Sequence, residues 1–430
     1  MGQSELYVSL DIGSSTVKVL IGEMANQSLH VIGVGNIKSG GIRRGAIVDI
    51  DATVQSIRQA VEQAERMIGK SINEVVLGIP ANQVQLQPVK GVVAVNSENR
   101  EITDIDLERV HEAAQVVSIP PDREFVNVVP VQYIVDHVDD IEDPRGMMGI
   151  RLEMDGIMIT TSKTILHNVL RCVERAGLTI RDIYVQPLVA GHIALTEDEK
   201  YQGAACIDIG GGSTSLAVFQ EGHLVASSVL PIGGDHITKD LSIVLKTPTE
   251  QAEQIKLQYG HAFYDEASDS DYFDVPSVGG GTGERYSQKY ISEIIGVRLE
   301  ELFDMVLEEL HSIGIRDLPG GIVLTGGVSK LDGIQELARH ILQTRVRLFS
   351  PAFIGVREPQ YTTAVGLIQY AYMDDMFYGR LGGGAALGNP IGKEPAAQPK
   401  KQKVPKVKEK EKNGEGVTAK AKRFIDKFFE

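Results

Sequence analysis

Two short turns rich in Gly and Ser, each beginning with an Asp after an apolar segment, are the parts of the sequence best suited to chemistry. The first reads DIGSST at residues 11–16 and the second DIGGGST at residues 208–214. Such turns can point successive backbone N–H groups into one concavity, and their small side chains let a phosphate approach closely. One copy alone would most simply be a hairpin turn. Two copies, each between an apolar strand and a β-rich strand, favour a pair of facing phosphate-binding turns.

Charged side chains accompany the two turns. Asp11 and Asp208 are suited to hold Mg²⁺ through water, because this ion gives up its water reluctantly. Lys18, seven residues after Asp11, could reach a phosphate oxygen.

The elements that position these turns are expected to repeat along the chain. Strands are predicted at 6–10, 16–22, 29–36, 75–79, 92–95, 125–134, 155–161, 183–186, 204–209, 214–220, 223–230, 321–325 and 346–349. Helices are predicted at 52–69 with Asp51 as N-cap, and at 104–117, 164–176, 187–195, 235–245, 249–260, 284–311, 331–342 and 361–373. A repeat of about 200 residues indicates two related α/β lobes, since solenoid repeats are far shorter.

Composition separates an acidic body from a basic tail. The 430 residues are 42% apolar and 23% charged, as in soluble globular proteins, and the net charge of −15 argues against a nucleic-acid partner. Residues 393–430 hold 12 Lys and Arg against 6 Asp and Glu, a net of +6, which leaves −21 for residues 1–392. The asymmetry predicts an anionic partner for the tail. No uncharged apolar run reaches the roughly 18 residues of a spanning helix, so we expect any membrane contact to be peripheral.

The last thirteen residues, TAKAKRFIDKFFE at 418–430, have the pattern of an amphipathic helix. The apolar positions are Ala421, Phe424, Ile425, Phe428 and Phe429, and the basic flanks are Lys420, Lys422, Arg423 and Lys427. Such a helix is only about 20 Å long, but it can lie in a membrane interface, where each basic residue adds about 1 kcal/mol on anionic lipid. Docking on its own body is the alternative, and the Lys-rich linker at 379–417 favours the membrane.

Five segments resemble the ATPase superfamily of actin, sugar kinases and heat-shock chaperones. LDIGSSTVKVLIG (10–22) and CIDIGGGSTSLAVF (206–219) are similar to its phosphate motifs, IVLTGGVSKLDGI (322–334) to its adenosine motif, and VQPLVAGHIAL (185–195) and YTTAVGLIQYA (361–371) to its connecting helices. The resemblance implies ATP and Mg²⁺ as cofactors. It also implies phosphate contacts from Gly13, Ser14, Ser15, Lys18, Gly210, Gly211, Gly212, Ser213 and Thr214, and adenosine contacts from Gly326, Gly327 and Val328.

Two further points of resemblance concern Glu253, Lys256 and Gln186. Glu253 and Lys256 match the pair that contacts ribose and base in bacterial actins, although an ordinary exposed ion pair one helical turn apart is an equal alternative. Gln186 matches the superfamily's position that orients a water in line with the γ-phosphate, although a polar cap on the helix that follows is an equal alternative. The resemblance therefore makes Gln186 and Asp208 the catalytic candidates. Because an amide is a poor base, we expect slow hydrolysis or mere binding.

The place of an insertion narrows the resemblance to the FtsA family of bacterial cell-division proteins. Residues 84–161 interrupt the first lobe after the strand at 75–79, as in that family, and SGGIRRGAIVDIDATVQSI (39–57) and VPSVGGGTGERYSQKYISEII (275–295) are also similar. The resemblance implies an actin-like fold of two ribonuclease-H-like lobes with an inserted subdomain in each. The expected parts are lobe I (1–83 and 162–197) with insertion 84–161, lobe II (198–246 and 312–378) with insertion 247–311, linker 379–417 and terminal helix 418–430.

The same resemblance implies a peripheral protein on the cytoplasmic side of the cell membrane, at the division site. There it would form ATP-dependent filaments and tether the tubulin-like FtsZ ring, with later division proteins bound through residues 84–161. The FtsZ C-terminal peptide would contact Arg285, Lys289 and Arg298 on the helix expected at 284–311, for which a solvated helix face is the alternative. A small-metabolite kinase of the same fold is the alternative function, and it would need a general base and substrate-binding residues in the cleft.

Overall fold

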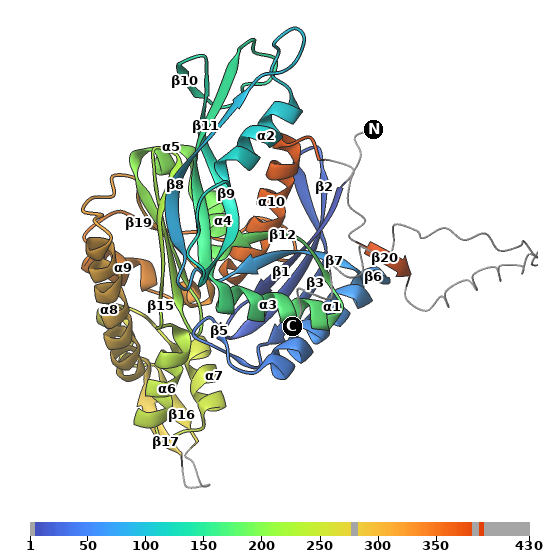
Figure 1. The fold of residues 1–430 in the computed structure, drawn as a ribbon. Helices are drawn as coiled ribbons and strands as arrows, with labels where there is room; N and C mark the ends of the chain where they lie inside the picture. Colours follow the sequence, from blue (N-terminus) through green and yellow to red (C-terminus); the bar gives the residue numbers. More distant parts are fainter. Residues whose placement is uncertain (1–4, 277–282, 381–386, 391–430) are drawn as a thin grey trace, which may run out of the picture. The chain divides into compact units, whose positions relative to one another are not determined.

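Two five-stranded sheets of the same construction form the centre of the protein. The computed structural model describes residues 5–276, 283–380 and 387–390 (Figure 1). The first sheet contains β1 (Glu5–Ile12), β2 (Thr16–Ala25), β3 (Ser28–Lys38), β7 (Glu74–Ile79) and β12 (Thr179–Val185). The second contains β13 (Ala204–Ile209), β14 (Thr214–Gln220), β15 (His223–Leu230), β18 (Gly321–Thr325) and β19 (Val346–Leu348).

The two sheets correspond strand for strand. The orders β3-β2-β1-β7-β12 and β15-β14-β13-β18-β19 each place three antiparallel strands beside two parallel ones. The predicted duplication of an α/β lobe is therefore confirmed.

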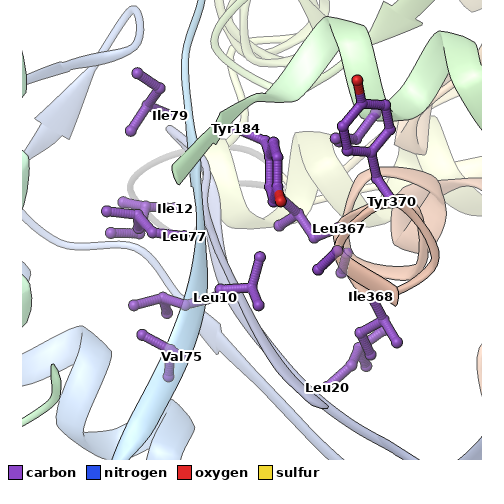
Figure 2. Close-up of a cluster of buried hydrophobic side chains, with 14 of the residues drawn as sticks. Leu10, Ile12, Leu20, Val75, Leu77, Ile79, Tyr184, Leu367, Ile368 and Tyr370 are labelled. Carbon is purple, nitrogen blue, oxygen red and sulfur yellow. The ribbon is translucent and has the colours of Figure 1, made fainter. Parts of the chain in front are cut away.

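Helices α4 (Gln186–Ala194) and α10 (Thr362–Phe377) pack between the sheets. In β13, Ala204 and Cys206 face the core shared with these helices, whereas Ala205 and Ile207 face the opposite core. This alternation follows from the two-residue period of a strand. Figure 2 shows Leu367 and Ile368 of α10 beside side chains of the first sheet. A helix that follows the second sheet in the sequence thus completes the core of the first lobe.

Other helices cover the outer faces of the sheets, and one of them begins earlier than expected. Helices α1 (Ile50–Ile68) and α3 (Lys163–Ala176) pack in the core of the first sheet, and α6 (Gly234–Val244), α8 (Gln288–Ser312) and α9 (Ile334–Leu342) in that of the second. Asp49, not the expected Asp51, caps α1, because its Oδ1 accepts a hydrogen bond from the Ala52 N–H at 3.0 Å. A short helix, α5 (Glu197–Gln202), was not anticipated.

The insertion in the first lobe is a four-stranded sheet with one helix against it. It contains β8 (Gln85–Ala94), α2 (Asp104–Ala114), β9 (Arg123–Val135), β10 (Val138–Ile141) and β11 (Arg151–Ser162), with strand order β10-β9-β11-β8. Its apolar residues form a separate core. Strand β8 is longer than the predicted 92–95, because its first half carries exposed polar residues that hide the strand pattern.

The second lobe carries α7 (Thr249–Tyr259) and a hairpin of β16 (Tyr272–Val275) and β17 (Glu284–Ser287). The helix expected at 284–311 is wrong at its start, because residues 284–287 pair with β16 and the Ser287 hydroxyl caps α8 by accepting from the Tyr290 N–H. Arg285 therefore lies on β17, with its guanidinium carbon 5.4 Å from the Tyr272 ring centroid. Helix α9 begins three residues later than expected, after a 3-10 turn at Gly327–Lys330.

Part of the expected linker forms a strand. Leu387–Pro390 (β20) pairs with β6 (Lys70–Ile72), and Arg380 forms ion pairs with Asp374 and Asp375. The expected amphipathic helix at 418–430 lies outside the described residues. Among the helices that the structure describes, none combines the length and apolar character needed to cross a membrane.

We predict that Gly35→Ala destabilises the fold severely. Strand β3 approaches α1 so closely that a Cβ on Gly35 would lie 1.9 Å from the Ala60 carbonyl oxygen. The helix would have to move, and we expect a loss of about 3 kcal/mol or more in the free energy of unfolding, measured by urea denaturation. Gly146→Ala is the control, since nothing lies within 4 Å of its Cβ position and only its positive φ of 75° is costly. Equal losses in the two variants would contradict the prediction.

Candidate functional site

A cleft of about 550 Å³ opens where the ends of β1 and β13 meet the N-termini of α4 and α10. Nearly all residues expected to contact a nucleotide line it, although they come from five separated segments of the sequence. They are Asp11, Gly13, Ser14, Ser15, Lys18, Gln186, Asp208, Gly210, Gly211, Gly212, Ser213, Glu253, Lys256, Gly326, Gly327 and Val328. Thr214 is the exception: its side chain is buried and its hydroxyl donates to the Ile232 carbonyl oxygen at 2.8 Å.

The two Gly- and Ser-bearing turns have the same backbone geometry. The Gly13 N–H donates to the Thr16 carbonyl oxygen at 3.0 Å, and the Gly210 N–H donates to the Ser213 carbonyl oxygen at the same distance. In each turn a Cβ on the glycine would lie 2.9 Å from that carbonyl oxygen. The first glycine of both turns is therefore required by the tightness of the turn.

The turns touch each other across the cleft. A Cβ on Gly211 would lie 2.0 Å from Ser15 Oγ, and one on Gly212 would lie 2.6 Å from Ser14 Cβ. Glycine at these two positions thus lets the serines of one lobe reach the backbone of the other. Small groups that present backbone N–H donors from two sides can form an anion-binding concavity.

Asp235, which the sequence analysis did not single out, joins the turns from the second lobe. It lies in the first turn of α6, where its N–H donates to the Gly211 carbonyl oxygen at 2.8 Å. Its Oδ2 accepts a hydrogen bond from the Ser15 hydroxyl at 3.0 Å, across the cleft. The sequence feature that could have identified Asp235 is the GGD triplet after the third strand of the second lobe, because it marks the start of a helix next to the turn.

Three polar side chains meet at the first-lobe side of the cleft. Asp11 and Lys18 are opposite one another in the β1–β2 register, both are buried, and Lys18 Nζ lies 3.1 Å from Asp11 Oδ2. Gln186 Nε2 donates to Asp11 Oδ1 at 2.7 Å and to the Ile12 carbonyl oxygen at 3.3 Å. Both amide hydrogens are thus engaged, and the amide oxygen of Gln186 is left to accept from a water. Its side chain does not cap α4.

The equivalent Asp of the second lobe is held by the equivalent helix. Thr363, in the first turn of α10, donates from Oγ1 to Asp208 Oδ2 at 3.1 Å. Burial raises the pKa of Asp208 to about 6; the Lys18 ammonium opposes this shift and the Asp11 carboxylate adds to it. Gly326, at φ 88°, packs so closely against Asp208 that a Cβ on Gly326 would lie 2.2 Å from Asp208 Oδ1. A half-buried carboxylate of this kind is a ready partner for a cation.

The far end of the cleft contains Glu253 and Lys256 of α7. Their carboxylate oxygen and ammonium nitrogen lie 2.7 Å apart, and Lys256 also donates to the Gly234 carbonyl oxygen at 3.1 Å and to Thr238 Oγ1 at 2.8 Å. Lys256 is only 5% exposed. The pair therefore differs from an ordinary exposed ion pair in its buried lysine, whereas the Glu253 side chain is 41% exposed. Both residues line the cleft together with Val328.

The basic residues expected to bind a peptide lie away from this cleft. Lys289 of α8 pairs with Asp269 at 3.3 Å. Arg298 of the same helix pairs with Asp240 of α6 at 2.6 Å and with Glu301. Arg298 is thus a link between two helices of the second lobe as well as a surface charge.

Comparison with known sequences gives consistent matches. Models of the families described as "Cell division protein FtsA" and "SHS2 domain inserted in FTSA" match residues 205–366 and 81–160. The cell division protein FtsA of Bacillus subtilis (strain 168) is 55% identical over 380 residues, which cover 88% of this chain and 86% of that protein. The FtsA of Enterococcus faecalis is 38% identical over 441 residues that cover 100% of both chains.

Comparison with solved structures identifies the fold. MreB5 of Spiroplasma citri bound to ADP has a TM-score of 0.52 at 14% identity and covers 88% of this chain and 99% of its own. The PilM-PilN type IV pilus biogenesis complex has a TM-score of 0.57 at 20% identity and covers 84% of this chain and 97% of its own.

We predict that Asp208→Asn stabilises the ligand-free protein at neutral pH. Because the folded pKa of Asp208, about 6, lies above the ordinary 3.8, the folded state holds this proton more tightly. The contribution of Asp208 to stability is therefore full at low pH and is lost as the pH rises from about 4 through 6, by up to about 3 kcal/mol.

The measurement is urea unfolding of the wild-type protein and Asp208→Asn at several pH values. We expect the variant to be more stable near pH 7.5 and its advantage to shrink toward pH 5. Asp198→Asn removes an exposed carboxylate and is the control. A stability gap that does not change with pH would contradict the assignment.

Proposed function

This chain belongs to the FtsA family of cell division proteins and has an actin-like fold, and from that premise we propose that it binds ATP with Mg²⁺ and links the division ring to the membrane. The observation that carries the proposal is the pair of equivalent turns, which meet across the cleft with their glycines and serines toward each other. Backbone N–H donors from two sides suit a polyphosphate. The cleft volume of about 550 Å³ is also within the usual range for small-molecule sites.

The phosphates and the nucleoside would occupy opposite ends of the cleft. Ser14, Ser15 and the Gly210 to Gly212 turn would hold the phosphates, and Lys18 supplies the positive charge beside them. Gly326, Gly327 and Val328 would lie along the adenosine, with Glu253 and Lys256 near the ribose and base. MreB5 of Spiroplasma citri, which shares the fold, has been solved with ADP and with AMPPNP.

Mg²⁺ fits the carboxylates at the phosphate end. Asp11 and Asp208 approach the cleft from corresponding strands, and burial raises the pKa of Asp208, with a smaller contribution from the Asp11 carboxylate. Oxygen donors of this kind suit Mg²⁺, which keeps several waters and also binds phosphate oxygens. When bound, the ion would neutralise charge on the phosphates.

Hydrolysis would depend on Gln186. Its amide nitrogen is fixed by Asp11 and the Ile12 carbonyl group, which leaves its oxygen to orient an attacking water. An amide does not remove the proton from that water efficiently, so slow turnover follows.

Membrane and protein contacts complete the proposal. Residues 418–430 would lie in the cytoplasmic face of the membrane as an amphipathic helix, with filaments of this protein assembled there through ATP. The FtsZ C-terminal peptide would bind the second lobe near Lys289 and Arg298. Because Arg298 already pairs with Asp240, an acidic peptide would have to compete with that carboxylate or add to it. Residues 84–161, a subdomain with its own core, would receive later division proteins.

We predict that Lys18→Met weakens ATP binding by at least about 10-fold, since a buried ammonium beside a phosphate makes a charge-assisted hydrogen bond. Methionine keeps the volume of the side chain. Binding of ATP with Mg²⁺ would be measured by calorimetry, with Lys163→Ala on α3, an exposed lysine, as the control. If Lys18→Met binds ATP as tightly as wild type, the phosphate assignment is wrong.

We also predict that the full chain floats with vesicles containing anionic lipid and recruits FtsZ to them, and that a chain ending at Gly416 does neither. The apolar face of residues 418–430 supplies the insertion energy and the basic flanks supply the preference for anionic lipid. The double variant Phe424→Ser and Phe428→Ser keeps the full chain length but removes part of the apolar face. It therefore shows whether flotation depends on this face or only on the length of the chain. Flotation of the truncated protein would refute the tether.

A further inference from the structure

A small hairpin beside the first phosphate turn has no assigned role. Strands β4 (Ile42–Arg43) and β5 (Ala46–Ile47) pair with Ile42 opposite Ile47, and Arg44 and Gly45 form the turn between them. Both turn residues have positive φ, 51° and 74°, which an arginine adopts only at a cost. A turn kept in a costly conformation indicates that its position matters.

The hairpin holds the hydroxyl group of Ser14. The Gly45 N–H donates to Ser14 Oγ at 2.8 Å. Because this bond occupies a lone pair of the oxygen, the Ser14 O–H is left to donate, and within the described residues it has no acceptor. Ser14 lines the cleft, so this O–H can be directed to a bound phosphate.

Asn82 in turn holds the hairpin. Its Nδ2 donates to the Arg44 carbonyl oxygen at 3.1 Å. Its Oδ1 packs on Gly45 so closely that a Cβ there would lie 2.4 Å away. That Oδ1 is buried and receives no hydrogen bond in the part of the chain that the structure describes. An amide with one unsatisfied atom is unfavourable for stability alone, which is consistent with a role in placing the hairpin.

Asn82 also belongs to the root of the inserted four-stranded sheet. It lies between β7 and β8, where the chain enters the insertion, and its carbonyl oxygen accepts from Thr161 Oγ1 at 3.2 Å, where the chain leaves it. The neighbouring Gln83 carbonyl oxygen accepts from an Arg123 guanidinium nitrogen at 2.9 Å. The chain of contacts therefore runs from a phosphate turn to both strands that join the insertion to the first lobe.

We propose that Asn82 is a positioning residue for the first phosphate turn, which acts through the hairpin at 42–47 on the Ser14 hydroxyl and couples phosphate binding to the root of the insertion. The proposal rests on the ATP site proposed above. Coupling is reciprocal, so phosphate bound at Ser14 must also change the stability of the root.

A double-mutant cycle tests the positioning role. Binding of ATP with Mg²⁺ is measured by calorimetry for wild type, Asn82→Ala, Ser14→Ala and the double variant. We expect Asn82→Ala to weaken binding about 3- to 10-fold in the wild-type background, as for one misplaced hydrogen bond. With Ser14→Ala present, we expect a further loss of less than about 2-fold, because Asn82 then has nothing to position.

Controls separate positioning from folding. Asn99→Ala removes an exposed amide in the same insertion, which bonds only to Glu101 in the described part of the chain, and it should leave ATP binding unchanged. Asn82→Asp keeps the shape of the side chain but cannot donate to the Arg44 carbonyl group, and it replaces Asn82→Ala if that variant unfolds. Equal losses in the presence and absence of Ser14 would mean that Asn82 is merely structural, and would overturn the proposal.

Hydrogen exchange tests the coupling to the root. ATP should slow amide exchange in wild-type peptides that cover residues 80–86 and 158–163, and this protection should disappear in Asn82→Ala at saturating ATP. Protection that persists in the variant, or is absent in a wild-type protein that binds ATP, would overturn the coupling. A wild-type protein that binds no ATP in the same titrations would instead refute the proposed function.

Discussion

The apolar layer between the two sheets is the constraint on which the rest of the structure depends. One continuous core includes the first sheet, α4, α10 and one face of β13 and β14. Because α10 follows the second sheet in the sequence and packs on the first sheet, the first lobe does not complete its core without the second half of the sequence. This layer also fixes the separation of the sheets, and with it the contact between the Ser14 turn and the Gly211 turn.

The polar cleft is built at the edge of that layer and is unfavourable for stability in the absence of a ligand. Asp11 and Lys18 are buried charges, and burial raises the pKa of Asp208 to about 6. Taking such groups out of water costs several kcal/mol unless each is paired and hydrogen-bonded. Gln186 donates a hydrogen bond to Asp11 and Thr363 donates one to Asp208, which offsets part of this cost. A bound ligand would have to offset the rest.

Sequence alone located the turns and most of the cleft, because both depend on local signals. A strand that ends in Asp-Ile-Gly leads into a turn wherever it occurs, and its duplication implied that the two copies face each other. Asp235, Asn82 and the Arg298 pair with Asp240 were missed, since each acts through a residue far away in the sequence. The predicted start of α8 was wrong for the same reason: residues 284–287 were expected to be helical, but they pair with β16.

The two lobes have nearly the same backbone arrangement but different side chains at equivalent positions. The two sides of the cleft therefore differ chemically. Asp11 faces Lys18 in its hairpin register, whereas Asp208 faces Ser215 at the corresponding place. The first-turn residue that bonds each Asp is Gln186 on α4 but Thr363 on α10. The first lobe therefore contributes both the ammonium group and the amide with a free oxygen. For a nucleotide bound between the turns, the charge that develops during phosphate cleavage would be met from the side of the first lobe, where Lys18 and Gln186 share Asp11 as a partner.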